Sequence, residues 1–206
     1  LENFIKYAKE INYSYVFVTT NGAAATYKRI AKAIDNGLDS IKFSIHGGTP
    51  ETYKSIHGKD DFERVIKNLK MVDKYRKENN KNLKIYVAMV ETFANKSETE
   101  TLRKIVESHI DGWDHKKMFN SCGTMPENNL IGEIEENNIR GREHSDVCFQ
   151  PFGSFTITPE GLMSGCVLDY HKALIVGDVN KKSLKELWHS EVYQGWRKRH
   201  LEKKTN

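Results

Sequence analysis

Two cysteines enclose a segment whose residue pattern predicts a β-hairpin. Cys148 precedes a run in which Phe155 and Ile157 alternate with threonines, Pro159-Glu160-Gly161 supplies turn residues, and a second short run ends at Cys166. A hairpin brings residues that are distant in sequence to the same end, so the two thiolates could bind one metal centre. The spacing of this segment is Cys-x12-Gly-x4-Cys.

The number of cysteines bears on their chemistry. The chain has three in 206 residues, and an odd number without secretory features argues against a disulfide framework. The alternative for Cys148 and Cys166 is that they are small buried hydrophobic residues. Cys122 lies outside the hairpin segment, and we interpret it as an ordinary loop or core thiol.

The composition bounds the class of protein. With 38% hydrophobic residues the chain can form one core of ordinary size, or a core with a small appendage. No apolar run approaches the length of a membrane span, so we expect a soluble, cytoplasmic protein with no membrane partner. The net charge is only +4, and the basic clusters Lys28-Arg29, Lys181-Lys182 and Arg197-Lys-Arg199 are expected to be solvated faces, too sparse for nucleic acid.

Strands and helices are predicted to alternate along the first half. Residues 15–20, 41–46 and 83–90 read as strands, and residues 3–11 and 27–34 have helical spacing. Further helices carry start signals: Thr49-Pro50-Glu51, Asp60 or Asp61, and the capping-box pattern Ser97-x-x-Glu100. This order predicts a parallel sheet with helices packed on it.

In such a fold, functional residues collect where the strands end. Here those ends are Thr19-Thr20-Asn21-Gly22, Ser44-Ile45-His46-Gly47-Gly48 and Val90-Glu91-Thr92. Strand alternation places Lys42, Ser44 and His46 on one side, which suits a polar barrel mouth. The alternative is that these are ordinary polar residues of strands and loops.

The cysteine segment resembles the opening of the SPASM domain, the auxiliary iron–sulfur module of many radical SAM enzymes. Downstream, Ile175-Val-Gly-Asp178 followed by Ser183-Leu-Lys-Glu-Leu-Trp188 is similar to the family's short strand and Ser-Leu-x-Glu-x-Trp segment. Ser183 and Glu186 are expected to cap a helix on which Trp188 and Trp196 share one packed face with Leu184, Leu187 and Tyr193.

The strand ends resemble the radical SAM core, a partial (β/α)6 barrel. Thr19-Thr20-Asn21-Gly22 is similar to that core's third strand end, and Phe43-Ser-Ile-His-Gly-Gly48 to its fourth, in which His46 replaces the usual acid. The resemblance implies that Thr19 or Thr20, with Asn21 and Ser44, contact S-adenosylmethionine. It also implies that Arg64 meets the carboxylate of that cofactor.

The resemblance implies an α/β fold in two parts. We expect residues 1–140 to form a partial (β/α)6 TIM-like barrel from the third strand onward, and residues 141–206 a small α+β SPASM-like domain with the hairpin. Neither the Cys-x3-Cys-x2-Cys loop of the radical SAM core nor the remaining SPASM cysteines occur in this sequence. We therefore expect a fragment of a longer enzyme, inactive by itself.

The implied activity of the parent enzyme is reductive cleavage of S-adenosylmethionine to a 5′-deoxyadenosyl radical, which abstracts hydrogen from a peptide or small-molecule substrate. The implied cofactors are [4Fe–4S] clusters and S-adenosylmethionine, with Cys148 and Cys166 as ligands of an auxiliary cluster. A flavodoxin or ferredoxin is the implied reductant.

Two other functions remain open from the residues. The first is a non-catalytic zinc or scaffold module, in which His144 or His171 joins Cys148 and Cys166. The second is an unrelated α/β phosphate-binding enzyme that uses Gly47-Gly48, ahead of the Thr49 helix, to bind an anion.

Overall fold

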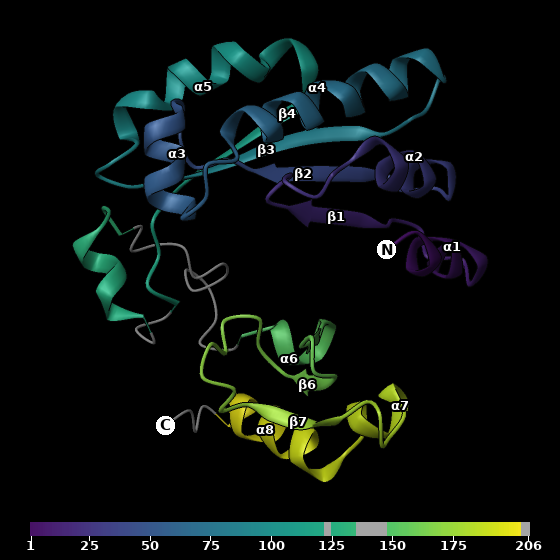
Figure 1. Cartoon of the computed structure of the whole chain (residues 1–206). Coiled ribbons are helices and arrows are strands. Elements are labelled where there is room, and N and C mark those ends of the chain that lie inside the picture. Colours follow the sequence, from purple (N-terminus) through teal and green to yellow (C-terminus); the bar gives the residue numbers. More distant parts are fainter. Residues whose placement is uncertain (122–124, 135–147, 203–206) are drawn as a thin grey trace. The chain divides into compact units, whose positions relative to one another are not determined.

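The computed structural model describes residues 1–121, 125–134 and 148–202, and the chain divides into two compact units (Figure 1). The first unit comprises residues Leu1–Met118 and Ile131–Glu133, and the second comprises Phe119–Leu130 and Ile134–Asn206. The predicted boundary at residue 140, like Cys122 and His144, lies outside the described residues.

A four-stranded parallel sheet forms the centre of the first unit. Its strands are β1 (Phe17–Thr20), β2 (Ser40–Ser44), β3 (Lys84–Glu91) and β4 (Gly112–Lys117), in spatial order β1-β2-β3-β4. The helices between and around them are α1 (Glu2–Glu10), α2 (Tyr27–Asp35), α3 (Pro50–His57), α4 (Phe62–Glu78) and α5 (Thr99–Val106), with short 3-10 turns η1 (Lys96–Glu98) and η2 (Glu107–His109). The predicted α/β fold with a parallel sheet is confirmed.

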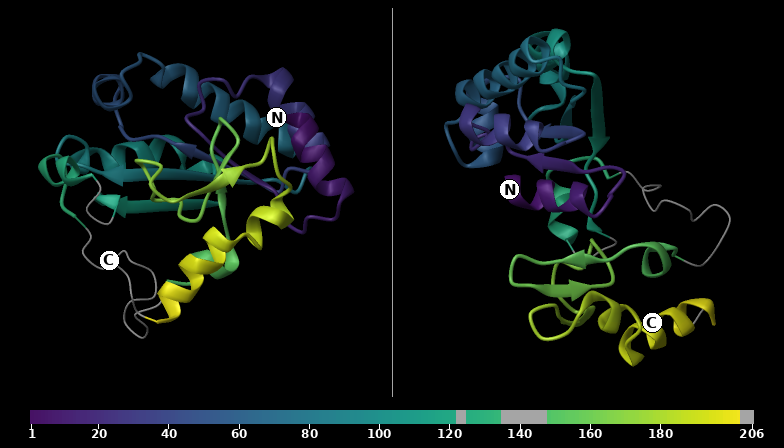
Figure 2. Two further views of the ribbon diagram at one scale, coloured as in Figure 1. Left: turned by 90° about the horizontal axis from the view of Figure 1, so that it is seen from below. Right: turned by 90° about the vertical axis from the view of Figure 1, so that its right-hand side faces the viewer.

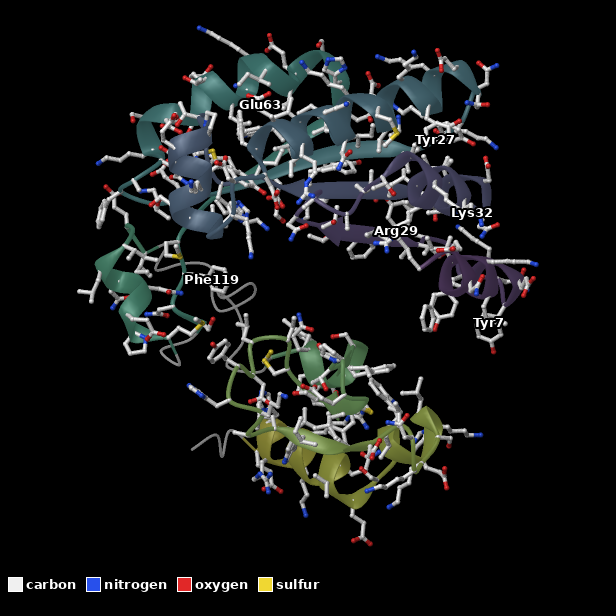
Figure 3. The ribbon with its side chains drawn as sticks, viewed as in Figure 1. Tyr7, Tyr27, Arg29, Lys32, Glu63 and Phe119 are labelled. Carbon is white, nitrogen blue, oxygen red and sulfur yellow. The ribbon has the colours of Figure 1, made fainter. Side chains whose placement is uncertain are left out.

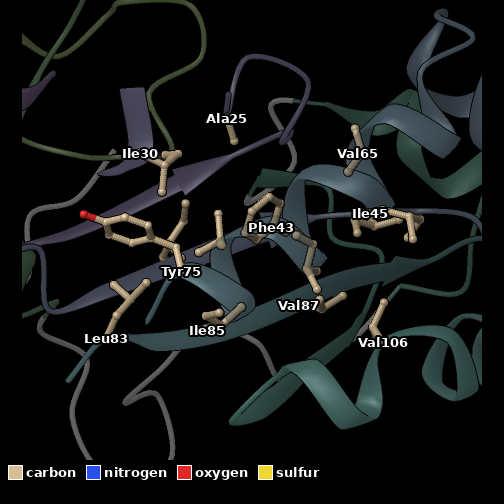
Figure 4. Packing of buried hydrophobic residues seen from close by; sticks show 14 of the residues in the cluster. Ala25, Ile30, Phe43, Ile45, Val65, Tyr75, Leu83, Ile85, Val87 and Val106 are labelled. Atoms are coloured by element: carbon tan, nitrogen blue, oxygen red, sulfur yellow. The ribbon is translucent and has the colours of Figure 1, made fainter. Parts of the chain in front are cut away.

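One face of the sheet carries the core. Phe43, Ile45, Ile85 and Val87 are fully buried and pack with residues of the helices, such as Val65 (Figure 4). Burying each such side chain stabilises the fold by roughly 1.5–3 kcal/mol. Because side chains alternate along a strand, the residues between them face away from the helices and are only partly buried.

Surface residues of α2 behave as predicted. Lys28 and Arg29 are exposed, as expected of a solvated basic cluster, and Figure 3 labels Arg29.

Helix starts were predicted with mixed success. The Thr49 hydroxyl accepts a hydrogen bond from the Thr52 amide at 3.3 Å, as predicted for α3. Asp61 is the N-cap residue of α4 but its side chain makes no capping bond. The predicted capping box of Ser97 and Glu100 is wrong, because residues Lys96–Glu98 form a 3-10 turn and α5 begins at Thr99.

Strand β4 is an element that the residue patterns did not predict. Its sequence is Gly-Trp-Asp-His-Lys-Lys, which has almost no apolar alternation. It is nevertheless paired with β3 over its whole length, from Tyr86 opposite Gly112 to Glu91 opposite Lys117. An edge strand needs apolar residues on one face only, and here Trp113 alone packs against the core.

The second unit contains a three-stranded antiparallel sheet. Its strands are β5 (Thr156–Ile157), β6 (Leu162–Ser164) and β7 (Ile175–Asp178), in that order, and its helices are α6 (Gln150–Gly153), α7 (Leu184–Trp188) and α8 (Glu191–Leu201). The predicted hairpin is confirmed as β5 and β6, with Gly161 at φ +88° in the turn. A 3-10 turn, η4 (Pro126–Leu130), belongs to the same unit.

Helices α7 and α8 pack against this small sheet (Figure 2). Met163, Leu187 and Tyr193 form its buried core, with Trp188 and Trp196 packed beside them. The single helix predicted here is in fact two, because Ser190 starts α8 by accepting a hydrogen bond from the Tyr193 amide at 3.3 Å. The capping box of Ser183 and Glu186 on α7 is confirmed.

The described residues include no helix that is long and apolar enough to cross a membrane.

Candidate functional site

The open face of the parallel sheet carries two of the predicted cofactor-binding residues. The register places Thr19 of β1 beside Lys42 of β2, and Ser44 of β2 beside Ala88 of β3. In a parallel sheet neighbouring residues in register point to the same side, so Thr19 and Ser44 lie on the face away from the helices. Both are at least partly exposed there, near the carboxyl ends of their strands.

A charged pair that sequence reasoning missed lies on the same face. Lys42 Nζ lies 2.9 Å from Asp114 Oδ2, and the two side chains are about 30% exposed, at 31% and 28%. Asp114 is in register with Ala88, which is in register with Ser44, so the backbone of Asp114 lies at the level of Ser44. Burial alone would raise the pKa of Asp114, but Lys42 and Lys116 outweigh it and hold that pKa below its ordinary value.

Thr20 and Asn21 shape the loop after β1. The Thr20 hydroxyl accepts a hydrogen bond from the Gly22 amide at 3.1 Å, and Asn21 Oδ1 accepts one from the Ala23 amide at 3.2 Å. Thr20 is in register with the buried Phe43, so it points to the helix face, unlike Thr19. Asn68 of α4 donates to the Gly22 carbonyl at 2.8 Å and fixes the loop from that side.

Arg64 lies in the first turn of α4. Its guanidinium is bound to Asp61 Oδ1 at 2.5 Å, and its side chain is 59% exposed. Since α4 covers the helix face of the sheet, the structure does not group Arg64 with Thr19 and Ser44. Its contact with a cofactor carboxylate stays a prediction.

The position at which the resembled family has an acid is a neutral imidazole here. His46 Nδ1 accepts a hydrogen bond from the Val90 amide at 3.1 Å, and His57 Nε2 accepts one from the His46 amide at 3.2 Å. The two rings stack, with centroids 5.1 Å apart. Burial, followed by the proximity of His57, lowers the pKa of His46 to about 4, so the ring is uncharged at neutral pH.

Asn95 joins the ends of β2 and β3. It is fully buried; its Nδ2 donates to the His46 carbonyl at 2.9 Å and to the Val90 carbonyl at 3.0 Å. Its Oδ1 accepts from the Thr92 amide at 2.7 Å. One side chain therefore satisfies three backbone groups that the ends of two strands leave open.

Glu98 occupies the anion site that Gly47-Gly48 and the start of α3 were predicted to offer. Its carboxylate accepts hydrogen bonds from the amides of Gly48 (2.7 Å) and Thr49 (3.1 Å) and from the hydroxyls of Thr49 (3.0 Å) and Thr52 (2.6 Å). A side chain on Gly48 would collide with the Glu98 backbone. The phosphate-binding interpretation is therefore opposed by an internal carboxylate that already neutralises this helix end.

Cys166 lies in a tightly bonded loop of the second unit. The Leu168 amide donates to Cys166 Sγ at 3.4 Å. Asp169 closes the loop by accepting from the amides of Ala173 and Leu174, both at 2.8 Å, and from the Ser164 hydroxyl at 3.0 Å. The Cys166 side chain is part-exposed and Cys148 is exposed, so neither behaves as a buried apolar residue.

These contacts test how well the described residues fit a metal centre. The Cys166 environment suits a ligand, and the exposed Cys148 is accessible for the same role. Within residues 1–121, 125–134 and 148–202, however, no three His, Cys, Asp or Glu side chains lie close enough together to hold a metal ion. His171, which the zinc alternative proposed as a ligand, is therefore not part of such a group among these residues. The two thiols can supply part of a centre and do not complete one.

Two family models match separate parts of the chain. Residues 1–105 match the model of the radical SAM superfamily, and residues 148–206 match the SPASM model, described as an iron–sulfur cluster-binding domain. Over 71 residues the chain is 37% identical to an uncharacterized protein of Methanocaldococcus jannaschii, MJ0804, and 38% identical to a probable GTP 3′,8-cyclase of Saccharolobus islandicus. These matches cover 34% of this chain and only 24% and 22% of the two relatives.

Solved structures share the fold at low sequence identity. Streptococcus suis SuiB bound to the precursor peptide SuiA matches with a TM-score of 0.69 and 14% identity, over 95% of this chain and 52% of SuiB. The protein anSMEcpe with bound AdoMet matches with a TM-score of 0.62 and 15% identity, over 97% of this chain and 61% of that one. The chain thus spans little more than half the length of these solved chains.

Proposed function

The chain belongs to the radical SAM superfamily, and from this premise we propose that it provides part of the S-adenosylmethionine site and of an auxiliary iron–sulfur site in a radical SAM enzyme. One observation carries the proposal: Thr19 and Ser44 lie on the open face of the parallel sheet, near the strand ends. Ligands of open α/β sheets bind at that edge.

The chain's own residues would bind and orient S-adenosylmethionine. On the part of the chain that the structure describes, the Ser44 hydroxyl makes no hydrogen bond, so it can donate to a ligand without breaking the fold. Thr20 and Asn21 would hold the loop beside the ligand, because both side chains are used by that loop. Arg64 remains a candidate for the ligand's carboxylate.

The polar pair beside Ser44 would lie close to the reacting groups. Lys42 and Asp114 neutralise each other, whereas Lys116 leaves this part of the face with a net positive charge. When bound, a [4Fe–4S] cluster would supply the electron that splits S-adenosylmethionine into methionine and a 5′-deoxyadenosyl radical. Cys148 and Cys166 would hold part of the auxiliary cluster.

A peptide or small-molecule substrate belongs to the same proposal. The likeness to SuiB, which was crystallised with a precursor peptide, supports a peptide. The match to probable GTP 3′,8-cyclases supports a small molecule, although it covers only 71 residues. The proposal also includes a flavodoxin or ferredoxin as the reductant, which reduction assays with either protein would test. It further includes a cytoplasmic location, which cell fractionation would test.

The test is S-adenosylmethionine binding by the complete enzyme, purified and reconstituted without oxygen. Replacing Ser44 by alanine (S44A) should weaken binding about tenfold, the effect of one lost hydrogen bond. Ser40 lies on the same strand and the same face but at the opposite end, so S40A is the matched control. Equal affinity in S44A and S40A would contradict this assignment, and a complete enzyme without iron would overturn the function itself.

A further inference from the structure

Arg197 is buried, although it lies in a basic run that the sequence predicted to be solvated. Only 8% of it is exposed, whereas Lys198 and Arg199 beside it are exposed. The guanidinium carbon lies 4.1 Å from the ring centre of Trp188 and 4.1 Å from that of Tyr193. An arginine is almost never fully buried unless its charge is paired.

The hydrogen bonds of Arg197 reach two other elements. Its Nε donates to the carbonyl of Pro151 at 2.8 Å, and its Nη1 donates to the carbonyl of Trp188 at 2.8 Å. Pro151 belongs to α6, three residues after Cys148. The same helix α8 makes a second bond to this segment, from the Tyr193 hydroxyl to the Ser154 carbonyl at 2.9 Å.

The segment that carries Cys166 packs against the same part of α8. Gly165, the residue before Cys166, lies so close to Tyr193 and Trp196 that a side chain there would approach their rings to 2.9 and 2.8 Å. The stretch from Cys148 to Ser154 and the loop from Ser164 to Leu174 therefore share one support, the helix face formed by Tyr193, Trp196 and Arg197.

We propose that Arg197 is a positioning residue for the two-thiol metal site: by binding Pro151 it holds the Cys148 segment on the helix face where the Cys166 loop is also docked. This rests on the proposed role of the two thiols as cluster ligands. Within the described residues no carboxylate pairs with Arg197, and its Nη2 is buried without a hydrogen bond. Thiolates in the same small unit would supply compensating negative charge.

The first test needs no cluster. In the 206-residue chain with Cys122 replaced by serine (C122S), Cys148 and Cys166 are the two remaining thiols. Dibromobimane becomes fluorescent when it bridges two thiols, so its rate of bridging reports how often they meet. Arg197→Gln should lower that rate about tenfold, because a charge-assisted bond to the Cys148 segment is lost. Arg197→Lys, which keeps the charge, should recover part of it.

The matched control is Arg199→Gln, which removes an exposed arginine from the same helix. Its bridging rate should equal that of the parent chain. Near-ultraviolet circular dichroism of the tryptophans checks that the second unit is folded. If Arg197→Gln has lost that signal, Arg197→Lys takes its place, because it keeps the charge but lacks the planar group that reaches both the Pro151 and Trp188 carbonyls, and it should still bridge more slowly than the chain with Arg197.

The second test uses the complete enzyme and measures iron, labile sulfide and the electron paramagnetic resonance spectrum of the reduced clusters. Arg197→Gln should lose iron or change the auxiliary-cluster signal, and Arg199→Gln should do neither. Equal bridging and equal spectra in both variants would overturn the role of Arg197. Absence of bridging in the C122S chain that keeps Arg197 would overturn this role too. A wild-type complete enzyme without iron would instead overturn the proposed function.

Discussion

Asn95 Nδ2 donates to the backbone carbonyl of His46 at 2.9 Å, and so ties the loop after β3 to the end of β2. The same amide binds the Val90 carbonyl. The strand that carries Ser44 is therefore held in place by Asn95, which lies fifty-one positions further along the chain. Asn95 is not itself one of the predicted cofactor-binding residues. The geometry of the candidate site depends on this buried contact as much as on the residues that face it.

Replacing Asn95 by alanine should destabilise the first unit by about 3 kcal/mol, because buried backbone groups lose their partner. The free energy of unfolding, measured with urea, checks this. Asn79→Ala is the control, since Asn79 is exposed and its side chain binds only the Tyr75 carbonyl four residues earlier. A loss in N95A no larger than that in N79A would contradict the role given to Asn95.

Glu98 should contribute stability that disappears in acid. Burial raises its pKa, but hydrogen bonds from Thr52, Gly48 and Thr49 outweigh burial and hold the pKa below 4.5. The unfolded chain therefore binds a proton before the folded one does, and stability falls as the pH drops below 4.5 through the folded pKa. Glu98→Gln should lose about 2 kcal/mol at pH 7 and show a flatter acid profile.

The exposed Glu100, two residues further on, is the control for Glu98. Glu100→Gln should unfold like the wild type at pH 7 and in acid. Phosphate binding offers a separate check: the wild-type chain should not bind inorganic phosphate at Gly48, because the Glu98 carboxylate occupies those amides. Tight phosphate binding by the wild type would contradict this account.

His46 should make the first unit less stable as the pH falls from 6.5 to about 4. Burial and His57 lower its pKa in the folded chain to about 4, whereas the unfolded residue titrates at 6.5. The unfolded state thus binds more protons in this window, and stability declines by at most about 3 kcal/mol. His46→Gln should remove this part of the pH dependence. His189→Gln, at an exposed position, should leave it unchanged.

Asp169 should protect the Cys166 loop from opening. In Asp169→Asn the side chain keeps its shape but has one acceptor oxygen for the amides of Ala173 and Leu174. Hydrogen exchange of these two amides should accelerate about tenfold, the effect of losing one hydrogen bond. Asp178→Asn is the control: it keeps the oxygen that accepts from the Asn180 amide, so neither that amide nor the Cys166 loop should exchange faster.

The sequence predicted the fold where residue patterns act locally. Strands β1 to β3 alternate or end on loop residues, and Thr49 and Ser183 are true helix caps, so these elements were predicted correctly. Strand β4 was missed because an edge strand of mostly polar residues resembles a loop. The helix predicted across Ser190 is two helices, because a serine N-cap can interrupt an apolar pattern without a proline or glycine.

The candidate site was less predictable because its contacts connect distant segments. Alternation correctly separated Ser44 from the core, but only the register of β1 and β2 shows that Thr19 points to the open face and Thr20 to the helix face. Asn95, Glu98 and Asp114 each bind partners between forty-six and seventy-two positions away, a range set by the tertiary fold. Arg197 was assigned to a solvated run because its neighbours are charged.

Ala88 lies between Ser44 and Asp114 in the register, under the diagonal that joins Lys42 to Asp114. A bulky side chain at this position would occupy the space through which the two charges meet. Positions 42, 88 and 114 should therefore vary together in evolution. In a homologue with a large residue at position 88, we expect an uncharged residue at position 42 or at position 114.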